Sequence, residues 1–206
     1  MHRIAKDILG DADKVQLRAI PTNERIPAIR SGRVDMVVRT MTITCDRLEQ
    51  VAFSAPYFLT GQQVLAPPRT SSVTGYDASL AGKKVCSATG STAYDHLSAD
   101  KKDGRLPAST DISTTVPNQL DCLVRLQLGE VDAVVTDGAL AASQAAQDPP
   151  TVELKGPAFT KEYYGVAMKL GADDLVRQVN RILEDYRKDG GLEGVVRQVV
   201  APPHAG

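Results

Sequence analysis

The chain has 206 residues, a formal net charge of -1 and no tryptophan. This length suits one large domain or two small ones, and the near-neutral charge gives no support to nucleic-acid binding, which normally requires a basic face. Aromatic residues make up only 4% of the chain, which disfavours a sugar site built on aromatic stacking.

Neither a membrane span nor an export signal is recognisable in the sequence. No apolar run approaches the roughly 20 residues that cross a bilayer. The residues after Met1 are typical of a helix rather than of a signal peptide. Two explanations stay open: the protein is cytoplasmic, or its natural amino terminus has been removed.

The few cysteines and histidines give no sign of a metal site. Cys45, Cys86 and Cys122 share no C-x-x-C spacing, and three cysteines are too few for a disulfide scaffold. One disulfide plus one free thiol is an open alternative. We expect neither a metal ion nor a cofactor.

Apolar periodicity predicts alternating helices and strands in the first third of the chain. The predicted elements are, in order, a helix over 2–9, a strand over 15–20, a helix over 24–30 and a buried parallel strand over 34–40. Gly10 ends the first helix, and Asn23 can cap the second. A strand, a helix and a strand of these lengths predict a right-handed βαβ unit.

A second series of elements follows, and the chain then returns. Strands are predicted over 62–65, 84–88, 112–116, 131–135, 152–154 and 164–169, and helices over 92–101, 118–129, 139–146 and 173–188. A shorter helix towards Val200 and a frayed tail with Pro202, Pro203 and His204 complete the chain. This pattern predicts two lobes, 1–63 with 160–206 and an inserted 64–159. The alternative is a single doubly wound sheet.

Polar groups gather where the predicted strand over 34–40 ends. Thr40 and Thr42 lie on the same side of an extended chain, because its side chains alternate. Thr44 can cap a following helical turn that holds Arg47. Ligands of open α/β sheets bind at this end of the strands, and an arginine can hold both oxygens of a carboxylate. We therefore predict a carboxylate site. The alternative is a capped helix with a surface arginine.

Two turns of the second series complement that site. Gly90 allows close backbone approach, and Ser91 or Thr92 then opens a helix, which favours an anion. Asp137 follows an apolar strand, where its carboxylate either receives an ammonium group or caps the next helix. With Arg47, these residues predict a site for a zwitterion, with its carboxylate near Arg47 and its ammonium near Asp137. No catalytic motif is visible.

Four segments, which together cover nearly the whole chain, match the sequence elements of one protein family in the same order. They are SGRVDMVVRTMTITCDRLEQVAFSAPYFLTGQ, LAGKKVCSATGSTAYDHL, LGEVDAVVTDGALAA and YYGVAMKLGADDLVRQVNRILEDYRKDGGLEGVVRQ. The chain resembles the polar amino-acid family of periplasmic (extracellular) solute-binding proteins of ABC transporters, bacterial solute-binding protein family 3. The likeness is strongest to actinobacterial receptors for glutamate, aspartate or asparagine.

The resemblance implies a fold and a function. The fold is an α/β, two-lobe periplasmic-binding-protein type II fold, in which each lobe is a mixed, mostly parallel sheet flanked by helices. The function is that of a receptor, not an enzyme, which binds a polar amino acid such as glutamate, aspartate, asparagine or glutamine between its lobes. The receptor would then deliver this ligand to an ABC transporter permease.

The resemblance also implies the role of each candidate residue. The implied roles are α-carboxylate binding by Thr42, Arg47, Ser91 and Thr92, and α-ammonium binding by Thr40 and Asp137. Arg39 has no matching role in the family. It either pairs with an acidic ligand side chain or turns to solvent or to a structural acid, and both readings stay open.

The resemblance further implies a Cys86–Cys122 disulfide, because similar actinobacterial receptors contain one. It would close a loop of about 37 residues and contribute about 3–4 kcal/mol. Reduced buried thiols are the alternative. A disulfide would indicate export, consistent with a lipid-anchored protein on the extracellular face of the membrane.

The chain departs from the family layout at its start. Members begin with a strand, a glycine-rich loop bearing an aromatic residue, and then a helix, whereas Met1 falls inside that helix. We expect about 50–80 residues of this layout to be absent, which leaves the first lobe incomplete. We then expect weak or no ligand binding and dimerisation through an exposed sheet edge. We also expect that Cys45 has lost its partner.

Two other functions are compatible with this fold. A dehydratase that acts on cyclic carboxylates needs a Glu or His facing its substrate, and the sequence shows no such candidate. A ligand-sensing domain of a signalling membrane protein would need the same binding residues. The sequence does not separate a sensor from an importer.

Overall fold

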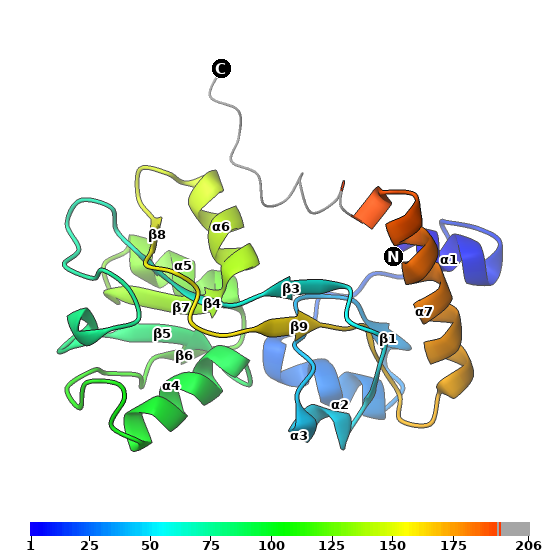
Figure 1. Cartoon of the computed structure of the whole chain (residues 1–206), viewed down its shortest axis with the longest axis horizontal. Helices are drawn as coiled ribbons and strands as arrows, with labels where there is room; N and C mark the ends of the chain where they lie inside the picture. Colours follow the sequence, from blue (N-terminus) through cyan, green and yellow to red (C-terminus); the bar gives the residue numbers. More distant parts are fainter. Residues whose placement is uncertain (193, 195–206) are drawn as a thin grey trace. The chain divides into compact units, whose positions relative to one another are not determined.

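A computed structural model describes residues 1–192 and 194 of the chain (Figure 1). It contains helices and β-strands in alternation, as the apolar periodicity predicts. Within the described residues, no helix is both long enough and apolar enough to cross a membrane.

The chain divides into two compact units. Unit 1 consists of Met1–Leu59 and the described residues from Tyr163 onward, and unit 2 consists of Thr60–Glu162. The chain passes between the units twice, at β3 (Phe58–Thr60) and at β9 (Glu162–Tyr164). These two strands pair with each other as a two-stranded sheet.

Unit 2 is built on a mixed five-stranded sheet with the order β6-β5-β7-β4-β8. Its strands are β4 (Gln62–Ala66), β5 (Val85–Ala88), β6 (Thr115–Val116), β7 (Ala133–Asp137) and β8 (Glu153–Lys155). β6, β5 and β7 run parallel, whereas β4 runs antiparallel to β7 and β8. Because successive side chains point to opposite faces, Val64 and Leu65 enter two different apolar clusters.

Helices cover both faces of this sheet (Figure 1). They are α4 (Thr92–Lys102), α5 (Gln119–Gln127) and α6 (Gly138–Gln147), with a 3-10 turn, η2 (Ala78–Leu80). α4 packs Ala93 and Leu97 into the cluster of Val64. α5 and α6 pack Cys122, Leu126 and Ala141 into the cluster of Leu65. Both faces are therefore covered, which explains why every residue of β5 and β7 is buried.

Unit 1 has a smaller sheet with the order β1-β10-β2, in which both pairs are antiparallel. Its elements are α1 (His2–Leu9), η1 (Thr22–Glu24), α2 (Arg25–Arg30), β1 (Met36–Val37), α3 (Cys45–Leu48), β2 (Ala52–Phe53), β10 (Ala167–Met168) and α7 (Asp173–Lys188). Ile4 of α1 and Val179 of α7 pack with Met168 on one side, whereas Ile29 of α2 packs with Ala167 on the other.

The predicted βαβ unit is wrong. Residues 15–20 form no strand, and Leu17 is 66% exposed. The strand predicted over 34–40 shrinks to Met36–Val37, and it pairs antiparallel with β10 rather than parallel. An alternating pattern shows which face a strand would bury, but a strand also needs a partner for its backbone groups. The returning chain supplies that partner to β1, and no described strand supplies one to 15–20.

The other predicted elements form, with shifted ends. α1 and α7 have the predicted bounds, and Gly10 ends α1 in a left-handed conformation with φ of 76°. Asn23 lies inside η1 and is not the cap of α2, which follows Glu24. The helix predicted towards Val200 extends beyond the described residues, and the tail from Pro202 onward lies outside them.

Candidate functional site

In unit 1, the predicted carboxylate-binding arginine is buried. Arg47 belongs to α3, a single helical turn whose N-cap is Thr44, as predicted: the Thr44 hydroxyl oxygen accepts from the Arg47 backbone N–H at 3.3 Å. The Arg47 residue is 8% exposed, and its Nη1 donates to the Thr42 carbonyl oxygen at 2.8 Å. The alternative of a capped helix with a surface arginine is therefore wrong.

The returning chain holds Thr42 in place. Thr42 is buried and forms an isolated antiparallel bridge with Tyr164, and the neighbouring Ile43 N–H donates to the Tyr163 carbonyl at 2.8 Å. Thr42 and Arg47 thus lie together, as the spacing predicts, but the segment that fixes them lies more than a hundred residues further along the chain.

Thr40 is anchored by a residue that the sequence analysis missed. The Thr40 carbonyl accepts from Nη1 of Arg25 at 2.9 Å, and Nε of Arg25 donates to the Thr22 carbonyl at 2.8 Å. Arg25 is itself buried. An arginine on a short amphipathic helix is usually solvated, so the sequence carries no signal for this role.

Arg39 is half-buried beside two backbone segments. Its Nη1 donates to the Ile20 carbonyl at 2.9 Å, and its own carbonyl accepts from the Tyr57 hydroxyl at 2.6 Å. This guanidinium therefore anchors the irregular segment over 15–20. Its role towards a ligand side chain stays a prediction.

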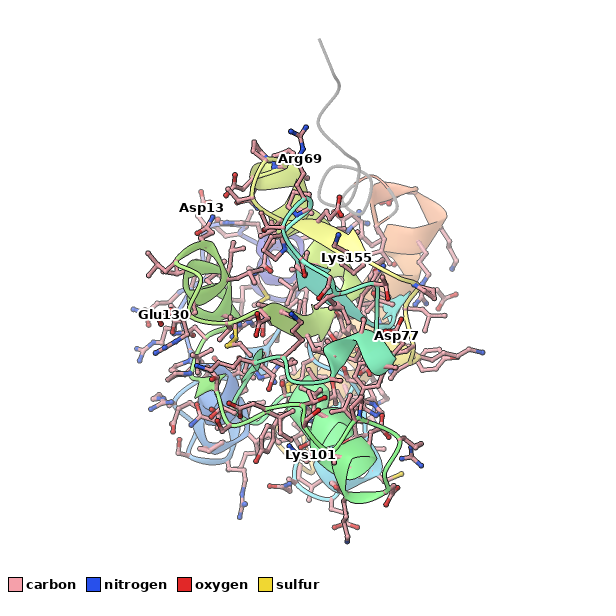
Figure 2. The ribbon with its side chains drawn as sticks, turned by 90° about the vertical axis from the view of Figure 1, so that its left-hand side faces the viewer. Asp13, Arg69, Asp77, Lys101, Glu130 and Lys155 are labelled. Carbon is pink, nitrogen blue, oxygen red and sulfur yellow. A yellow bond between two sulfur atoms is a disulfide. The ribbon has the colours of Figure 1, made fainter. Side chains whose placement is uncertain are left out.

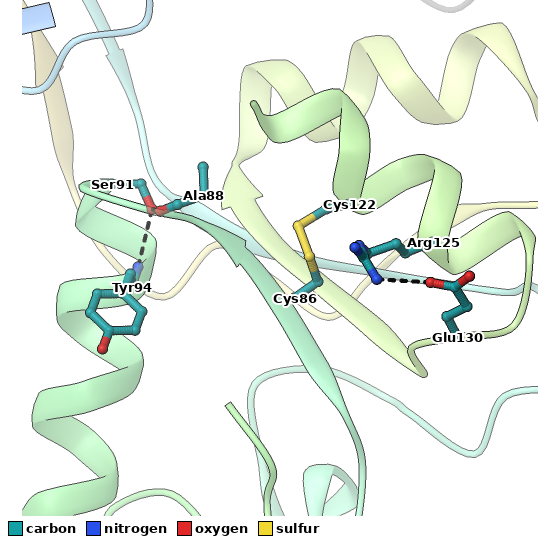
Figure 3. Close-up of a disulfide and its surroundings, with 7 residues drawn as sticks. All are labelled: Cys86, Ala88, Ser91, Tyr94, Cys122, Arg125 and Glu130. Atoms are coloured by element: carbon teal, nitrogen blue, oxygen red, sulfur yellow. Dashed lines mark hydrogen bonds and ion pairs between the residues drawn. A yellow bond between two sulfur atoms is a disulfide. The ribbon is translucent and has the colours of Figure 1, made fainter. Parts of the chain in front are cut away.

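In unit 2, Ser91 is the N-cap of α4, as predicted (Figure 3). Its hydroxyl oxygen accepts from the Tyr94 backbone N–H at 3.2 Å, and its proton is donated to the Ala88 carbonyl at 2.6 Å. The hydroxyl proton of Ser91 is therefore committed to the backbone of its own turn.

Thr92 and Asp137 come together through Gln62. The Gln62 amide nitrogen Nε2 donates to Oδ1 of Asp137 at 2.6 Å and to Oγ1 of Thr92 at 3.0 Å. All three residues are buried. The Asp137 side chain does not cap α6. Instead, the Thr60 hydroxyl accepts from the second N–H of that helix, at Ala139, at 3.2 Å, so the capping alternative for Asp137 is wrong.

Glu162 completes this group, and we call Gln62, Thr92, Thr160 and Glu162 the unit 2 polar ring. Glu162 is 2% exposed; its Oε2 accepts from the Thr92 hydroxyl at 3.0 Å and its Oε1 from the Thr160 hydroxyl at 2.9 Å. The Gln62 backbone N–H donates to the Thr160 hydroxyl oxygen at 2.8 Å and closes the ring. Nε2 of His96 lies 3.6 Å from Oε1 of Glu162.

The buried Glu162 carboxylate changes the pKa of the neighbouring His96. Glu162 raises the pKa of the His96 imidazole above its ordinary value, and partial burial of the imidazole opposes this shift. By contrast, Arg69, Asp77 and Glu130 carry their charges on the exposed outside of unit 2 (Figure 2). A buried carboxylate such as that of Glu162 normally has a positively charged partner, here His96, because its desolvation is costly.

The sequence carries no signal that marks Gln62 or Glu162 as a site residue. Gln62 opens an apolar strand, and Glu162 precedes two tyrosines, so each reads as a polar residue at a strand end. Such residues are usually solvated. Only the pairing of distant strands shows that their side chains are buried.

The predicted disulfide between Cys86 and Cys122 is confirmed (Figure 3). It joins β5 to α5 within one apolar cluster, with a Cα–Cα distance of 5.6 Å. Cys45 is a free, exposed thiol.

Two solved structures that match this chain are binding proteins for small solutes. An ancestral arginine-binding protein bound to glutamine matches with a TM-score of 0.84 at 34% identity, over 96% of this chain and 83% of that chain. A solute receptor for L-cysteine from Neisseria gonorrhoeae matches with a TM-score of 0.84 at 25% identity, over 99% and 79% of the two chains. The chain therefore has the predicted α/β periplasmic-binding-protein type II fold.

The family follows from the sequence comparison. The model of the bacterial extracellular solute-binding proteins, family 3, matches residues 1–200, so the chain belongs to this family. The glutamine-binding protein GlnH of an ABC transporter of Bacillus subtilis is 32% identical over 95% of this chain and 68% of its own length. The glutamate-binding protein GluB of Corynebacterium glutamicum is 29% identical over 96% and 66%.

A glutamine-binding protein of Geobacillus stearothermophilus is 33% identical over 79% of this chain and 59% of its own length. The chain thus spans about two thirds of the length of the curated relatives it matches. These relatives are all binding proteins of small solutes.

Proposed function

We propose that this protein is a solute receptor of an ABC importer and that it binds a polar amino acid without transforming it. The observation that carries the proposal is the buried carboxylate of Asp137, held by Gln62 beside the start of α4. Family membership and the glutamine- and glutamate-binding relatives support a ligand of the glutamate, glutamine, aspartate or asparagine type.

Unit 1 is assigned the α-carboxylate of the ligand. The Arg47 guanidinium is buried and is oriented by the Thr42 carbonyl. A desolvated, pre-oriented guanidinium is the side chain best suited to a carboxylate, because its planar fork donates to both oxygens. The Thr42 carbonyl accepts from this guanidinium. We retain Thr42 as a contact of the ligand carboxylate and Thr40 as a contact of the ligand ammonium group.

Unit 2 is assigned the α-ammonium and a second contact to the carboxylate. Asp137 supplies the acceptor for the ammonium group. The protons of the Ser91 and Thr92 hydroxyls are donated to Ala88 and Glu162. We therefore assign their contribution to backbone N–H groups in the first turn of α4, an eleven-residue helix whose positive end favours an anion.

Location and partners belong to the same proposal. The disulfide supports an oxidising compartment outside the cytoplasm, and the family description is extracellular. We propose that the receptor acts on the extracellular face of the membrane and delivers its ligand to a permease. A lipid anchor and dimerisation stay predictions. Light scattering of the purified chain would test dimerisation.

Titration of the chain with amino acids tests the function. Glutamine, glutamate, asparagine and aspartate would be followed by calorimetry and by ¹H–¹⁵N NMR, which also detects weak binding. Saturable shifts with at least one of them support the proposal, and none at millimolar concentration contradicts it. Micromolar affinity would contradict the separate expectation of weak or no ligand binding.

A further inference from the structure

The hydrogen bonds that end on Glu162 have a defined direction. An ionised carboxylate only accepts hydrogen bonds. The hydroxyls of Thr92 and Thr160 must therefore both donate to Glu162, at 3.0 and 2.9 Å. His96, 3.6 Å away, supplies a positive charge that favours the ionised form of this buried acid.

The direction at Thr92 propagates to Gln62. Because the Thr92 proton points to Glu162, the Thr92 oxygen presents lone pairs to its other neighbour, Nε2 of Gln62. The same amide group donates its other hydrogen to Asp137. If Thr92 donated to Gln62 instead, the atom of Gln62 that faces Thr92 would have to be the amide oxygen. The same atom faces Asp137, which requires the amide nitrogen, so one orientation of the amide cannot serve both neighbours.

The orientation of the Gln62 amide leaves its oxygen without a hydrogen bond from any described residue, so its neighbours must hold the amide firmly in this orientation. Within the described residues, its oxygen Oε1 is buried without a hydrogen-bond partner, although the residue is only 1% exposed. A buried carbonyl without a partner is unfavourable. The amide keeps this orientation because Thr92 and Asp137 both require its nitrogen.

We propose that Glu162 is a positioning residue for the ligand's ammonium group, acting through Thr92 and Gln62 to fix the carboxylate of Asp137. This inference rests on the proposed function, since it assumes that Asp137 receives the ammonium. Glu162 does not touch the ligand in this scheme. It sets the polarity of a chain of three hydrogen bonds that ends on the acceptor.

The first test needs no ligand. Glu162→Gln keeps the shape of the side chain but replaces one acceptor oxygen by a donor, so Thr92 and Thr160 can no longer both donate to it. We expect the side-chain NH₂ signals of Gln62 to shift and to exchange faster with water in the NMR spectrum. In the matched control, Glu130→Gln makes the same change at an exposed carboxylate, which pairs with Arg125 at 2.8 Å and lies outside the hydrogen bonds that lead to Asp137. The Gln62 NH₂ signals of this control should stay near their wild-type positions.

The second test measures affinity with L-glutamine and L-glutamate as probes. Glu162→Gln should weaken binding at least about tenfold, whereas the control Glu130→Gln should change it less than about twofold. If Glu162→Gln does not fold, Thr92→Val interrupts the same path. Thr92→Ser keeps the hydroxyl and should restore the affinity that Thr92→Val loses.

The outcomes separate this proposal from the proposed function. Unchanged Gln62 signals in Glu162→Gln, or equal losses of affinity in Glu162→Gln and Glu130→Gln, would overturn the positioning role while wild-type binding stands. Equal affinities of Thr92→Val and Thr92→Ser would overturn it as well. A wild-type chain that binds no amino acid would refute the receptor function, and the positioning role with it.

Discussion

Gln62 and Asp137 lie directly opposite each other in the antiparallel pair of β4 and β7, and the amide of the first donates to the carboxylate of the second at 2.6 Å. Side chains at opposed positions of two strands share one face of the sheet. The register of the sheet therefore decides that this glutamine meets this aspartate, and a slip of one residue would turn Gln62 to the other face.

Replacement of Gln62 by leucine should destabilise the protein. Leucine has a similar volume, but it removes the amide that donates to Asp137 and Thr92 inside a buried site. We expect a loss of about 1–3 kcal/mol in the free energy of unfolding, measured by urea denaturation. Gln63→Leu is the matched control, because the Gln63 amide donates to the Gly156 carbonyl at an exposed position. Equal losses in the two variants would contradict the importance of the buried contact.

The sequence predicted the positions of polar groups at strand and helix ends, because these depend on local patterns. Thr44 and Ser91 cap the helices that follow them, as their spacing indicates. Arg47 lies three residues after the Thr44 cap, and Asp137 is the last residue of the strand β7. In each case the burial of the neighbouring segment was visible as an apolar run.

What the sequence did not predict depends on contacts between distant segments. Glu162 meets Thr92 across 70 residues, and Gln62 meets Asp137 across 75. The strand expected over 15–20 fails for the same reason, because no local pattern specifies a partner strand. A single sequence shows which segments favour helix or strand, but it does not show which strands pair with each other.

Removal of the Arg47 side chain should abolish the binding of every amino acid. Arg47→Ala removes the proposed α-carboxylate partner, which all α-amino acids share. The expected result is no saturable binding by calorimetry or NMR. Circular dichroism would verify that the variant is folded, since the Thr42 carbonyl also loses its donor. Undiminished affinity for any ligand would rule out the carboxylate assignment.

Arg39 offers a comparison within the same unit. Arg39→Ala should change the ratio of affinities for glutamate and glutamine and leave the binding of the α-groups intact. If the ratio stays constant while stability falls, the guanidinium acts only as the anchor of the Ile20 carbonyl.

The disulfide should contribute more to stability than any single hydrogen bond of the site. Cys86 and Cys122 are separated by 36 positions, and closing a loop of this length lowers the entropy of the unfolded chain by an equivalent of about 4 kcal/mol. Cys86→Ala with Cys122→Ala should lower the free energy of unfolding by about this amount. Cys45→Ser is the control, and because Cys45 is exposed and unbonded, it should change stability by less than about 0.5 kcal/mol. Similar effects of the two changes would contradict the stabilising role.

Stability should fall as the pH rises through neutrality, because His96 is paired with Glu162. The pKa of His96 is raised in the folded protein, first by its interaction with Glu162 and against the effect of burial. A group whose folded pKa lies above its unfolded value stabilises the fold fully below the unfolded pKa, about 6.5 for histidine. That contribution disappears as the pH rises through the higher, folded pKa.

Urea denaturation at a series of pH values between about 5.5 and 8.5 would measure this dependence. His96→Gln removes the titrating ring, and Glu162→Gln removes its partner, so each variant should flatten the slope relative to wild type. His2→Gln is the control: it also removes an imidazole, but from an exposed position far along the chain from Glu162. The wild-type slope should persist in this control. A slope that survives His96→Gln would show that another group is responsible, and that the charge of His96 does not support the buried carboxylate.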